Sequence, residues 1–303
     1  MLVMHSLDPR HTSCFLAAVQ CGTIRAAAEH LGLEPSSVSR NISTLEKHLA
    51  ATLVERGRLG VRPTEAGDLL IAYLSQQDAA LDLLQSEFDA LAGMKRGKVS
   101  IAVGEGFIGD LFDNALSSFS TAYPDITFAL SVGSTDDVLH QVASEQSHVG
   151  LAYNVPKSQH IRVVANAPQP LVGLVQRGGR YDTGQPIGLD TLATMPFAVP
   201  PKSFGIGAMI AVAEAKQGIR LRAVIETGSI SALKAFVRTD MGCTILPRFV
   251  VESELASGLF AVRAIPERIF PAGRSSLIRK EGRKLPQAAH LLLGHIKAMA
   301  AFS

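Results

Sequence analysis

The stretch TIRAAAEHLGLEPSSVSRNISTLE, residues 23–46, specifies the fold of the N-terminal part of the chain. It predicts a short helix over residues 24–31, with Thr23 as the N-cap residue whose side-chain oxygen accepts a backbone N–H. Gly32 ends this helix, because glycine readily adopts the left-handed conformation found at helix C-termini. Pro35 opens a second helix at a position where its missing N–H costs no hydrogen bond. Two short helices joined in this way form a helix-turn-helix, whose second helix enters the major groove of DNA.

The second helix has an apolar face and a polar face. At about 100° per residue, the apolar face carries Val38, Ile42, Leu45 and Leu49. The opposite face carries only hydroxyl groups and cations, on Ser36, Arg40, Ser43, Thr44 and Lys47. Hydroxyl groups contact phosphates and bases, whereas arginine and lysine bind guanine or the backbone. The pattern favours a helix that reads DNA, and the alternative is a helix pair whose polar face is only hydrated.

Several short motifs around this stretch follow one another in a distinctive order. They are FLAAVQCGT at 15–23, AAA at 26–28, SR at 39–40, LE at 45–46, LVER at 53–56 and RPTEAG at 62–67. In this order and spacing they resemble the LysR-type family of bacterial transcriptional regulators, and the resemblance covers residues 7–67. Many members open the recognition helix with Ser-Gln-Pro, where this chain has Glu34-Pro35-Ser36, and Val54 and Pro63 also depart from the family pattern. Because the glutamine is missing, we assign base readout to Arg40, with Ser36 and Thr44 beside it.

A small basic hairpin is expected after the helices. Arg56, Arg58 and Arg62 surround Gly57 and Gly60, as in a wing between two short strands. Such a wing lays cations along the sugar-phosphate backbone, and the alternative is a solvated hairpin. Residues 1–63 are therefore predicted to form a winged helix-turn-helix domain that binds double-stranded DNA. The expected contact residues are Thr23, Arg25, Ser36, Ser37, Ser39, Arg40, Ser43, Thr44, Lys47, Arg56, Arg58 and Arg62.

Composition limits the class of protein. The chain has 303 residues, of which 47% are hydrophobic and 18% charged, which predicts two globular domains with a large core. The net charge of +2 gives no global basic field. No apolar run is long enough for a membrane helix and the start lacks a signal peptide, so we expect a cytoplasmic protein with no membrane partner. Cys14, Cys21 and Cys243 lack metal-ligand spacing, and we interpret Cys14 and Cys21 as small hydrophobic residues, with redox sensing as the alternative.

A long acidic helix is predicted over residues 64–92, within a linker that spans 64–93. It contains six acidic residues and no Lys, Arg or Pro, and it would be about 43 Å long. One seam repeats at alternating spacings of three and four residues, which indicates contact with another helix. The seam consists of Leu70, Leu74, Gln77, Leu81, Leu84, Phe88 and Leu91. We expect a dimerisation helix, as the family resemblance also implies, and the alternative is a helix packed on its own domain.

Residues 98–303 alternate between strand-like and helical patterns, which predicts an α/β domain with covered parallel sheets. The expected strands are 99–103, 126–132, 149–153, 171–175, 197–199, 222–226 and 243–246, and the expected helices are 110–122, 135–144, 207–217 and 229–238. This region resembles the two-lobed, periplasmic-binding-protein-like effector domain of the LysR-type family. The resemblance rests on FSTAYP at 119–124, ETGS at 226–229 and GCTILP at 242–247. It implies one lobe over 98–167 and 270–303 and a second over 168–268.

Ligands of α/β folds bind outside the carboxyl ends of the strands, which predicts an effector pocket there. In the family the matching positions line the cleft between the lobes. The expected residues are Gly106, Phe107, Ile108, Ser134, Thr135, Tyr153, Asn154, Pro201, Ser203, Phe204, Thr227, Gly228 and Ser229. Hydroxyl groups and helix N-termini at these positions suit a small carboxylate or another polar metabolite. The alternative for each residue is an ordinary helix cap.

One glycine motif points to a different class of protein. GEGFIG at residues 104–109, with Gly104, Gly106 and Gly109, matches the dinucleotide-binding pattern between a strand and a helix. The acid expected at the end of the next strand is absent, and Asp110 places negative charge where a pyrophosphate would bind. A nucleotide-dependent oxidoreductase is therefore the alternative, and a solute-binding module with a protein-interaction head is a third hypothesis. We expect no catalytic residues, no cofactor and no metal.

The sequence thus predicts a ligand-responsive bacterial transcriptional regulator. The resemblance implies a dimer or tetramer that binds an inverted-repeat promoter site, a small-molecule effector in the inter-lobe cleft, and RNA polymerase as a further partner. The identity of the effector, the operator sequence and the direction of regulation do not follow from the sequence.

Overall fold

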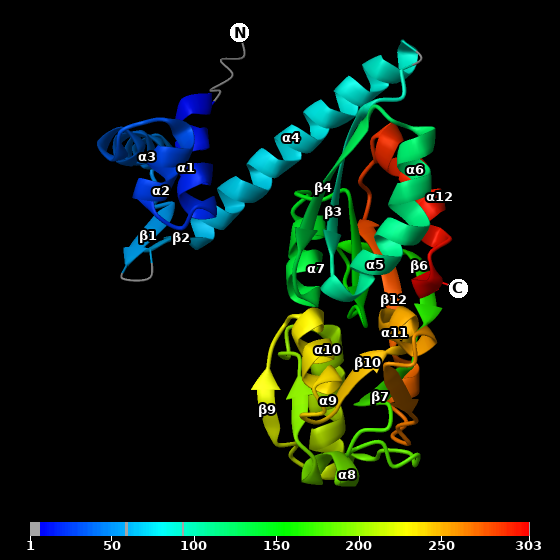
Figure 1. The fold of residues 1–303 in the computed structure, drawn as a ribbon. Helices are drawn as coiled ribbons and strands as arrows, with labels where there is room; N and C mark the ends of the chain where they lie inside the picture. The colour runs from blue at the N-terminus through cyan, green and yellow to red at the C-terminus, as the bar shows by residue number, and fades with distance from the viewer. Residues whose placement is uncertain (1–6, 58–59, 93, 303) are drawn as a thin grey trace. The chain divides into compact units, whose positions relative to one another are not determined.

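The computed structural model describes residues 7–57, 60–92 and 94–302. The chain divides into two compact units, which comprise residues 1–78 and 79–303. Figure 1 shows the order of the helices and strands along the chain. Each unit is described by itself below.

The first unit is a three-helix domain with a two-stranded wing. Its elements are α1 (Pro9–Gln20), α2 (Ile24–Leu31), α3 (Pro35–Leu49), β1 (Val54–Gly57) and β2 (Gly60–Pro63). As expected, Thr23 caps α2 by accepting the N–H of Ala26, and Gly32 ends it with a φ of 66°. Leu49 does not follow the expected apolar face, because it is the last residue of α3 and 37% of it is exposed.

Helix α4 (Glu65–Leu91) begins in the first unit and continues into the second. Its start is tightly packed, because a Cβ added to Gly67 would lie 2.2 Å from the carbonyl oxygen of Leu53. Within the predicted seam, Leu70 and Leu74 are buried in the core of the first unit. For these two residues the alternative holds, namely that the helix packs on its own domain. The later seam residues are exposed.

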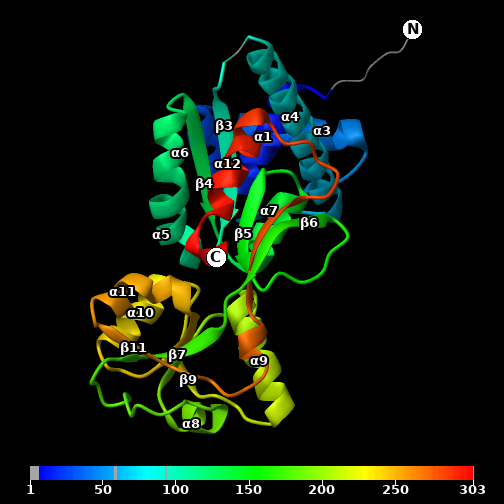
Figure 2. The same cartoon turned by 90° about the vertical axis from the view of Figure 1, so that its right-hand side faces the viewer.

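The second unit contains two α/β lobes. The sheet of lobe one has the order β4-β3-β5-β12-β6, in which β3 is parallel to β4 and β5 and β12 is antiparallel to both of its neighbours. Its strands are β3 (Gly97–Val103), β4 (Ile126–Val132), β5 (Val149–Tyr153), β6 (Ile161–Pro168) and β12 (Arg274–Lys280). Helix α7 (Thr135–Ala143) covers one face, and α5 (Ile108–Leu111), α6 (Ser117–Ala122) and α12 (Gln287–Lys297) lie on the other (Figures 1 and 2).

Lobe two carries two short sheets, with the orders β10-β7-β11 and β8-β9. A bridge between Phe197 and Cys243 connects them. The strands are β7 (Leu171–Gln176), β8 (Phe197–Val199), β9 (Ala223–Glu226), β10 (Thr244–Pro247) and β11 (Phe260–Arg263). The helices are α8 (Leu189–Thr194), α9 (Gly205–Gln217), α10 (Ile230–Arg238) and α11 (Glu252–Ala256). The predicted α/β class is confirmed, but the strand predictions missed β6, β11 and β12.

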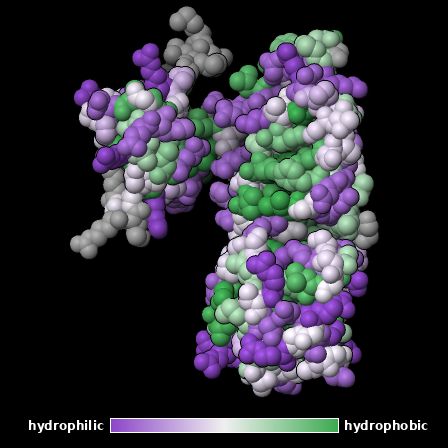
Figure 3. Space-filling view, viewed as in Figure 1, coloured by the Kyte–Doolittle hydropathy of each residue, from purple (hydrophilic) through white to green (hydrophobic). Residues whose placement is uncertain are grey.

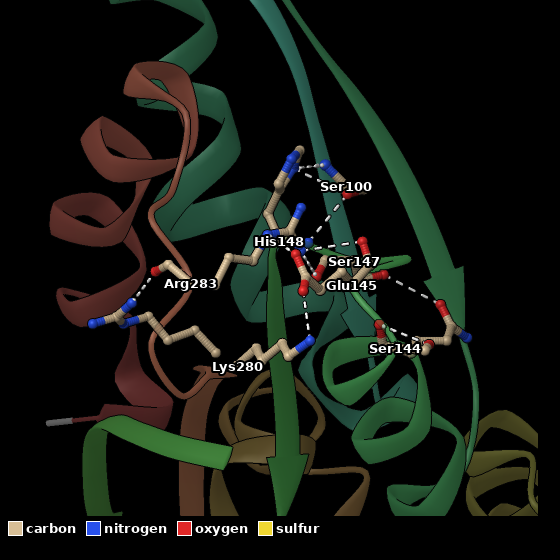
Figure 4. A network of polar contacts seen from close by, with 9 residues as sticks. Ser100, Ser144, Glu145, Ser147, His148, Lys280 and Arg283 are labelled. Carbon is tan, nitrogen blue, oxygen red and sulfur yellow. Dashed lines mark hydrogen bonds and ion pairs between the residues drawn. The ribbon is translucent and has the colours of Figure 1, made fainter. Parts of the chain in front are cut away.

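A buried polar network fixes the loop before β5 (Figure 4). The Nδ1 atom of His148 accepts the backbone N–H of Ser100 at 3.0 Å. Glu145, which has a φ of 63°, forms ion pairs with Lys280 and Arg283. Arg283 also donates to the carbonyl oxygens of Glu145 and Ser147, at 3.1 and 2.8 Å. Burial lowers the pKa of His148 to about 4, so this histidine is neutral at pH 7.

Candidate DNA-binding and effector sites

The exposed side of α3 carries the residues expected to read DNA. Val38, Ile42 and Leu45 are at most 1% exposed and hold the helix on the domain core. The cations Arg40 and Lys47 are exposed. Exposed Ser36 and Thr44 and half-buried Ser37, Ser39 and Ser43 complete the polar side. The helix therefore presents hydroxyl groups and cations from a fixed position.

Three of the predicted contact residues, Thr44, Thr23 and Arg25, already have structural partners. The Thr44 hydroxyl donates to the carbonyl oxygen of Arg40 at 2.9 Å, which is a contact within the helix. Thr23 caps α2, and Arg25 forms an exposed ion pair with Glu29 at 3.4 Å. Their side chains therefore support α2 and α3 in addition to any contact with DNA.

The wing is fixed to the helices by backbone contacts. Strands β1 and β2 are antiparallel, and Gly57 pairs with Gly60. The N–H of Val61 donates to the carbonyl oxygen of Gly22 at 2.7 Å, and a Cβ on Gly60 would lie 2.3 Å from the same oxygen. Arg62 is exposed on β2, Arg56 belongs to β1, and Arg58 lies outside the described residues.

The single acid on the flank of α3 has a structural explanation. The Oε1 atom of Glu46 accepts the backbone N–H of Leu53 at 2.9 Å and that of Val54 at 3.4 Å. Glu46 therefore joins the recognition helix to the first strand of the wing. These hydrogen bonds engage the Glu46 carboxylate inside the domain, beside the predicted DNA-binding side of α3.

A groove beside the N-terminal half of α3 adds residues that the sequence analysis missed. It has a volume of about 580 Å³, and Arg10, Ser13, Ser37, Arg40 and Asn41 line it together with apolar residues. Arg10 and Ser13 come from α1, so a helical periodicity analysis of the recognition helix alone does not find them. Two arginines, Arg10 and Arg40, therefore line one groove at the edge of the predicted DNA interface.

The cleft between the two lobes of the second unit is narrow and apolar. It encloses a cavity of about 40 Å³. Five of its lining residues were predicted, namely Gly106, Phe107, Thr135, Tyr153 and Phe204. Among the residues that were not predicted are Glu105, Ile206, Ile230, Pro247, Phe249 and Val250. Apolar side chains from both lobes therefore form most of the cavity wall.

One carboxylate crosses this cleft. Glu105 follows β3 in lobe one, and its Oε1 atom accepts from Ser229 Oγ at 3.3 Å, Ser231 N–H at 3.0 Å and Ser231 Oγ at 2.9 Å. Its Oε2 atom accepts from the N–H of Ile230 at 2.9 Å. The donors all lie at the N-terminus of α10 in lobe two. Helix N-termini favour negative charge, so the chain supplies its own anion at the position where we expected an effector carboxylate.

The polar groups of the predicted pocket are mostly engaged within the protein. Ser134 caps α7 and exchanges hydrogen bonds with Asp137, so its hydroxyl acts as a helix cap. Thr227 Oγ1 accepts the N–H of Ser229. A Cβ on Gly228 would lie 2.5 Å from the Phe204 ring, which explains the glycine there. The remaining predicted residues, Ile108, Asn154, Pro201 and Ser203, are not among those that line this cavity.

The tyrosine in the cleft is a buried structural donor. The Tyr153 hydroxyl donates to the carbonyl oxygen of Gln169 at 2.6 Å. Burial raises the pKa of Tyr153, which keeps the hydroxyl protonated. Burial also raises the pKa of the Cys243 thiol to about 12, and a protonated thiol is a poor redox sensor. Neither group has the properties of a reactive site.

The glycine motif at 104–109 does not form a dinucleotide-binding turn. Residues 105–107 form a short 3₁₀ helix (η1, Glu105–Phe107), which leads directly into α5. The carboxylate of Asp110 accepts the N–H groups of Ala300 and Ala301, so it fixes the end of the chain. Within the described residues, no cluster of His, Cys, Asp and Glu could hold a metal ion, and no helix is long and apolar enough to span a membrane.

The two units together define a class of protein. A winged helix-turn-helix domain with a basic, hydroxyl-rich helix binds DNA, and a two-lobed α/β domain with a central cleft binds a small molecule. Residues 9–68 match the model for the bacterial regulatory helix-turn-helix protein of the lysR family, and residues 92–301 match that of the LysR substrate binding domain. The chain belongs to the LysR family of ligand-responsive transcriptional regulators. Proteins of this family are regulators and not enzymes, so the oxidoreductase alternative is wrong.

Characterised relatives cover most of the chain. The transcriptional activator CmpR of Synechocystis is 26% identical over 82% of this chain and 81% of its own length. The activator LysR of Escherichia coli is 24% identical over 97% of this chain and 94% of its own length. A full-length OxyR variant from Pseudomonas aeruginosa has the same fold, with a TM-score of 0.68, 16% identity and coverage of 98% and 97% of the two chains. Full-length CbnR in complex with its target DNA superposes with a TM-score of 0.52 and 22% identity, over 96% and 99% of the two chains.

Proposed function

We propose that this regulator binds an inverted-repeat promoter site as a dimer or tetramer, and that a small-molecule effector in the inter-lobe cleft controls it. The observation that carries the DNA-binding part is the exposed side of α3. Arg40 and Lys47 are exposed there, whereas the apolar residues on the opposite side of the helix are at most 1% exposed. Arg40 also lines the groove that contains Arg10. The DNA complex of the structural neighbour CbnR supports this use of the fold.

Exposed apolar surfaces support the self-association. On α4, Leu81 and Phe88 are 65% and 57% exposed, and Leu84 and Leu91 extend the same face. A soluble helix rarely exposes such a stripe unless another chain covers it. The edge strand β4 exposes Val132 (54%), and Figure 3 shows apolar side chains gathered over β3 and β4. Two separate surfaces of this kind suit a dimer that pairs into a tetramer, because each surface can join a different pair of chains.

The effector acts in this proposal by shifting the population of lobe arrangements. A ligand changes an equilibrium only by its difference in affinity for the two states. Ligand pockets in proteins usually measure about 300–1,000 Å³, so an effector needs the cleft of about 40 Å³ to open. The opened arrangement would alter how the assembled regulator presents its α3 helices to promoter DNA and to RNA polymerase.

Arg40→Ala tests the DNA-binding part. The purified variant and the wild type are titrated against labelled DNA from upstream of the chain's own gene, and fluorescence anisotropy is measured at fixed salt. We expect at least a tenfold loss of affinity with an unchanged melting temperature, because one bidentate base contact contributes about 1–3 kcal/mol. Arg222→Ala, which removes an exposed cation from lobe two, is the control and should bind as the wild type does. Equal affinity of the Arg40 variant would contradict the proposed interface.

A further inference from the structure

The anion-binding site of the cleft is already filled by the protein. The N-terminus of α10 offers the N–H groups of Ile230 and Ser231 and the hydroxyls of Ser229 and Ser231, and all four donate to Glu105. A carboxylate has about four acceptor positions, and Glu105 accepts three hydrogen bonds at Oε1 and one at Oε2. Hydrogen bonds to a charged acceptor are also stronger than those between neutral groups.

The rest of the cavity wall offers few groups for a second anion. Phe107, Phe204, Ile206, Phe249 and Val250 contribute carbon surface. The two polar side chains that remain are satisfied internally. Thr135 Oγ1 accepts the N–H of Gly205 and donates to the carbonyl oxygen of Tyr153, and the Tyr153 hydroxyl donates to Gln169. A carboxylate ligand entering here would meet the negative charge of Glu105 and apolar side chains.

Opening of the cleft must break the contact between Glu105 and α10. The carboxylate belongs to lobe one and its four donors belong to lobe two, so separation of the lobes removes all four hydrogen bonds together. The cavity of about 40 Å³ holds no more than about three water molecules, so an effector cannot enter without that separation. The energy of this contact therefore contributes to the free energy of opening the cleft.

We propose that Glu105 is an internal carboxylate ligand of α10 that latches the two lobes together when the effector is absent. The charge of Glu105 stays in the cleft when the lobes separate and repels a carboxylate, and the rest of the wall is apolar, so that the effector is an uncharged molecule with an apolar face. This inference rests on the proposed function of the cleft as the effector site. It changes the effector class that the helix N-termini alone had suggested.

Chemical rescue of a variant tests the latch. Glu105→Ala leaves the α10 donors without their anion, and propionate is a free carboxylate with the same carbon chain as the whole glutamate side chain. Thermal unfolding of the full chain is measured with 0 to about 100 mM sodium propionate, with sodium chloride at equal ionic strength as the reference. We expect the variant to melt about 4–8 °C below the wild type, and propionate to restore about half of the loss. The wild type should not respond to propionate, because its site is filled.

Two further variants separate the latch from general effects. Glu105→Gln keeps the bulk of the side chain, so it should lose stability but stay insensitive to propionate. Ser231→Ala removes one exposed donor at 2.9 Å and should give a smaller loss without endangering the fold. Asp113→Ala removes an exposed carboxylate from the same lobe and should melt as the wild type does.

Two results would overturn the inference. One is a propionate response of the wild type equal to that of Glu105→Ala, and the other is a Glu105→Ala variant that neither loses stability nor responds. These measurements use no DNA, whereas the proposed function is tested with Arg40→Ala on promoter DNA. Normal promoter binding by Glu105→Ala combined with a failed rescue would remove the latch and leave the proposed function intact.

Discussion

The backbone N–H of Gly205 donates to the hydroxyl oxygen of Thr135 at 2.9 Å, and this hydrogen bond joins the first residue of α9 in lobe two to the first residue of α7 in lobe one. The approach is close, because a Cβ on Gly205 would lie 1.9 Å from the carbonyl oxygen of Tyr153. Backbone from lobe two therefore touches the end of β5 with no room for a side chain. This hydrogen bond and those of Glu105 both connect lobe one to lobe two across the same cleft.

Gly205→Ala should force the lobes apart at this point. The added methyl group cannot coexist with the Tyr153 carbonyl, and overpacking of this kind costs about 1–3 kcal/mol. We expect lower stability in urea unfolding and a larger radius of gyration of the effector domain in small-angle scattering. Gly109→Ala is the control, because a Cβ there meets no atom within 4 Å. If Gly205→Ala had the stability and the radius of gyration of the wild type, the contact would not restrain the lobes.

Stability should fall on acidification because of His148. Burial lowers the pKa of this residue from 6.5 to about 4, so the unfolded chain binds the proton more tightly than the folded chain. The neutral ring is retained above pH 6.5, and its contribution is lost as the pH falls from 6.5 toward 4. The expected loss is about 3 kcal/mol at pH 4. Protonation would also place an N–H on Nδ1 against the Ser100 N–H.

The pH effect is measured as the difference between the wild type and His148→Gln in urea unfolding at pH 7, 5.5 and 4. The variant removes the titrating ring, so its stability should fall less over this range. His160→Gln, which changes an exposed histidine, should follow the wild type. Parallel curves for the wild type and His148→Gln would show that this residue does not control the acid sensitivity.

Arg283→Met should be strongly destabilising. The Arg283 side chain is 5% exposed, and it holds Glu145 and the carbonyl oxygen of Ser147. Its removal leaves the carbonyl oxygens of Glu145 and Ser147 without this donor and leaves the Glu145 carboxylate with Lys280 as its remaining cation, which costs about 3–5 kcal/mol. Arg162→Met removes an exposed ion pair to Glu281 at 3.8 Å and should cost less than about 1 kcal/mol. Equal effects of the two changes in chemical unfolding would contradict the structural role of Arg283.

The sequence predicted the DNA-binding half more fully than the effector half, and the reason is the range of the interactions. Thr23, Gly32 and Pro35 act on residues within one helical turn, so local rules are sufficient to find α2 and α3. Strand β6 lies at a sheet edge and is mostly exposed or half-buried, so its apolar signal is weak. Strand β12 pairs with strands more than 100 residues away.

The candidate effector residues show the same limit. Helix caps such as Ser229 and Ser134 are visible in the sequence, but the partner of a cap is not. Glu105 stands 124 residues before Ser229, and only the folded lobes bring them together. The sequence interpretation therefore located the helix N-terminus and its hydroxyl groups, whereas the carboxylate that Glu105 supplies to them depends on the folded lobes.

Arg10 and Arg40 should affect DNA binding in different ways, although they line the same groove. Arg10 is at the start of α1, which suits a phosphate contact, and Arg40 is on the reading face of α3. Arg10→Ala should lower the affinity for all DNA sequences alike, and it should reduce the magnitude of the slope of log K against log salt concentration by about 1. Arg40→Ala should reduce the preference for the promoter over unrelated DNA. Anisotropy titrations at four salt concentrations decide this, and identical salt slopes for Arg10→Ala and the wild type would remove Arg10 from the interface.

The exposed face of α4 should determine the oligomeric state. Phe88→Glu places a charge in the apolar stripe that Leu81, Leu84 and Leu91 continue, and an uncompensated charge in such an interface is costly. Sedimentation velocity should show this variant as a monomer at micromolar concentration, with weaker promoter binding because two half-sites are no longer held by one particle. Ala90→Glu adds the same charge to another exposed position of α4 and should sediment as the wild type does. If Phe88→Glu kept the wild-type sedimentation coefficient, the α4 stripe would not be the dimer contact. The edge strand β4, with its exposed Val132, would then be the surface to change next.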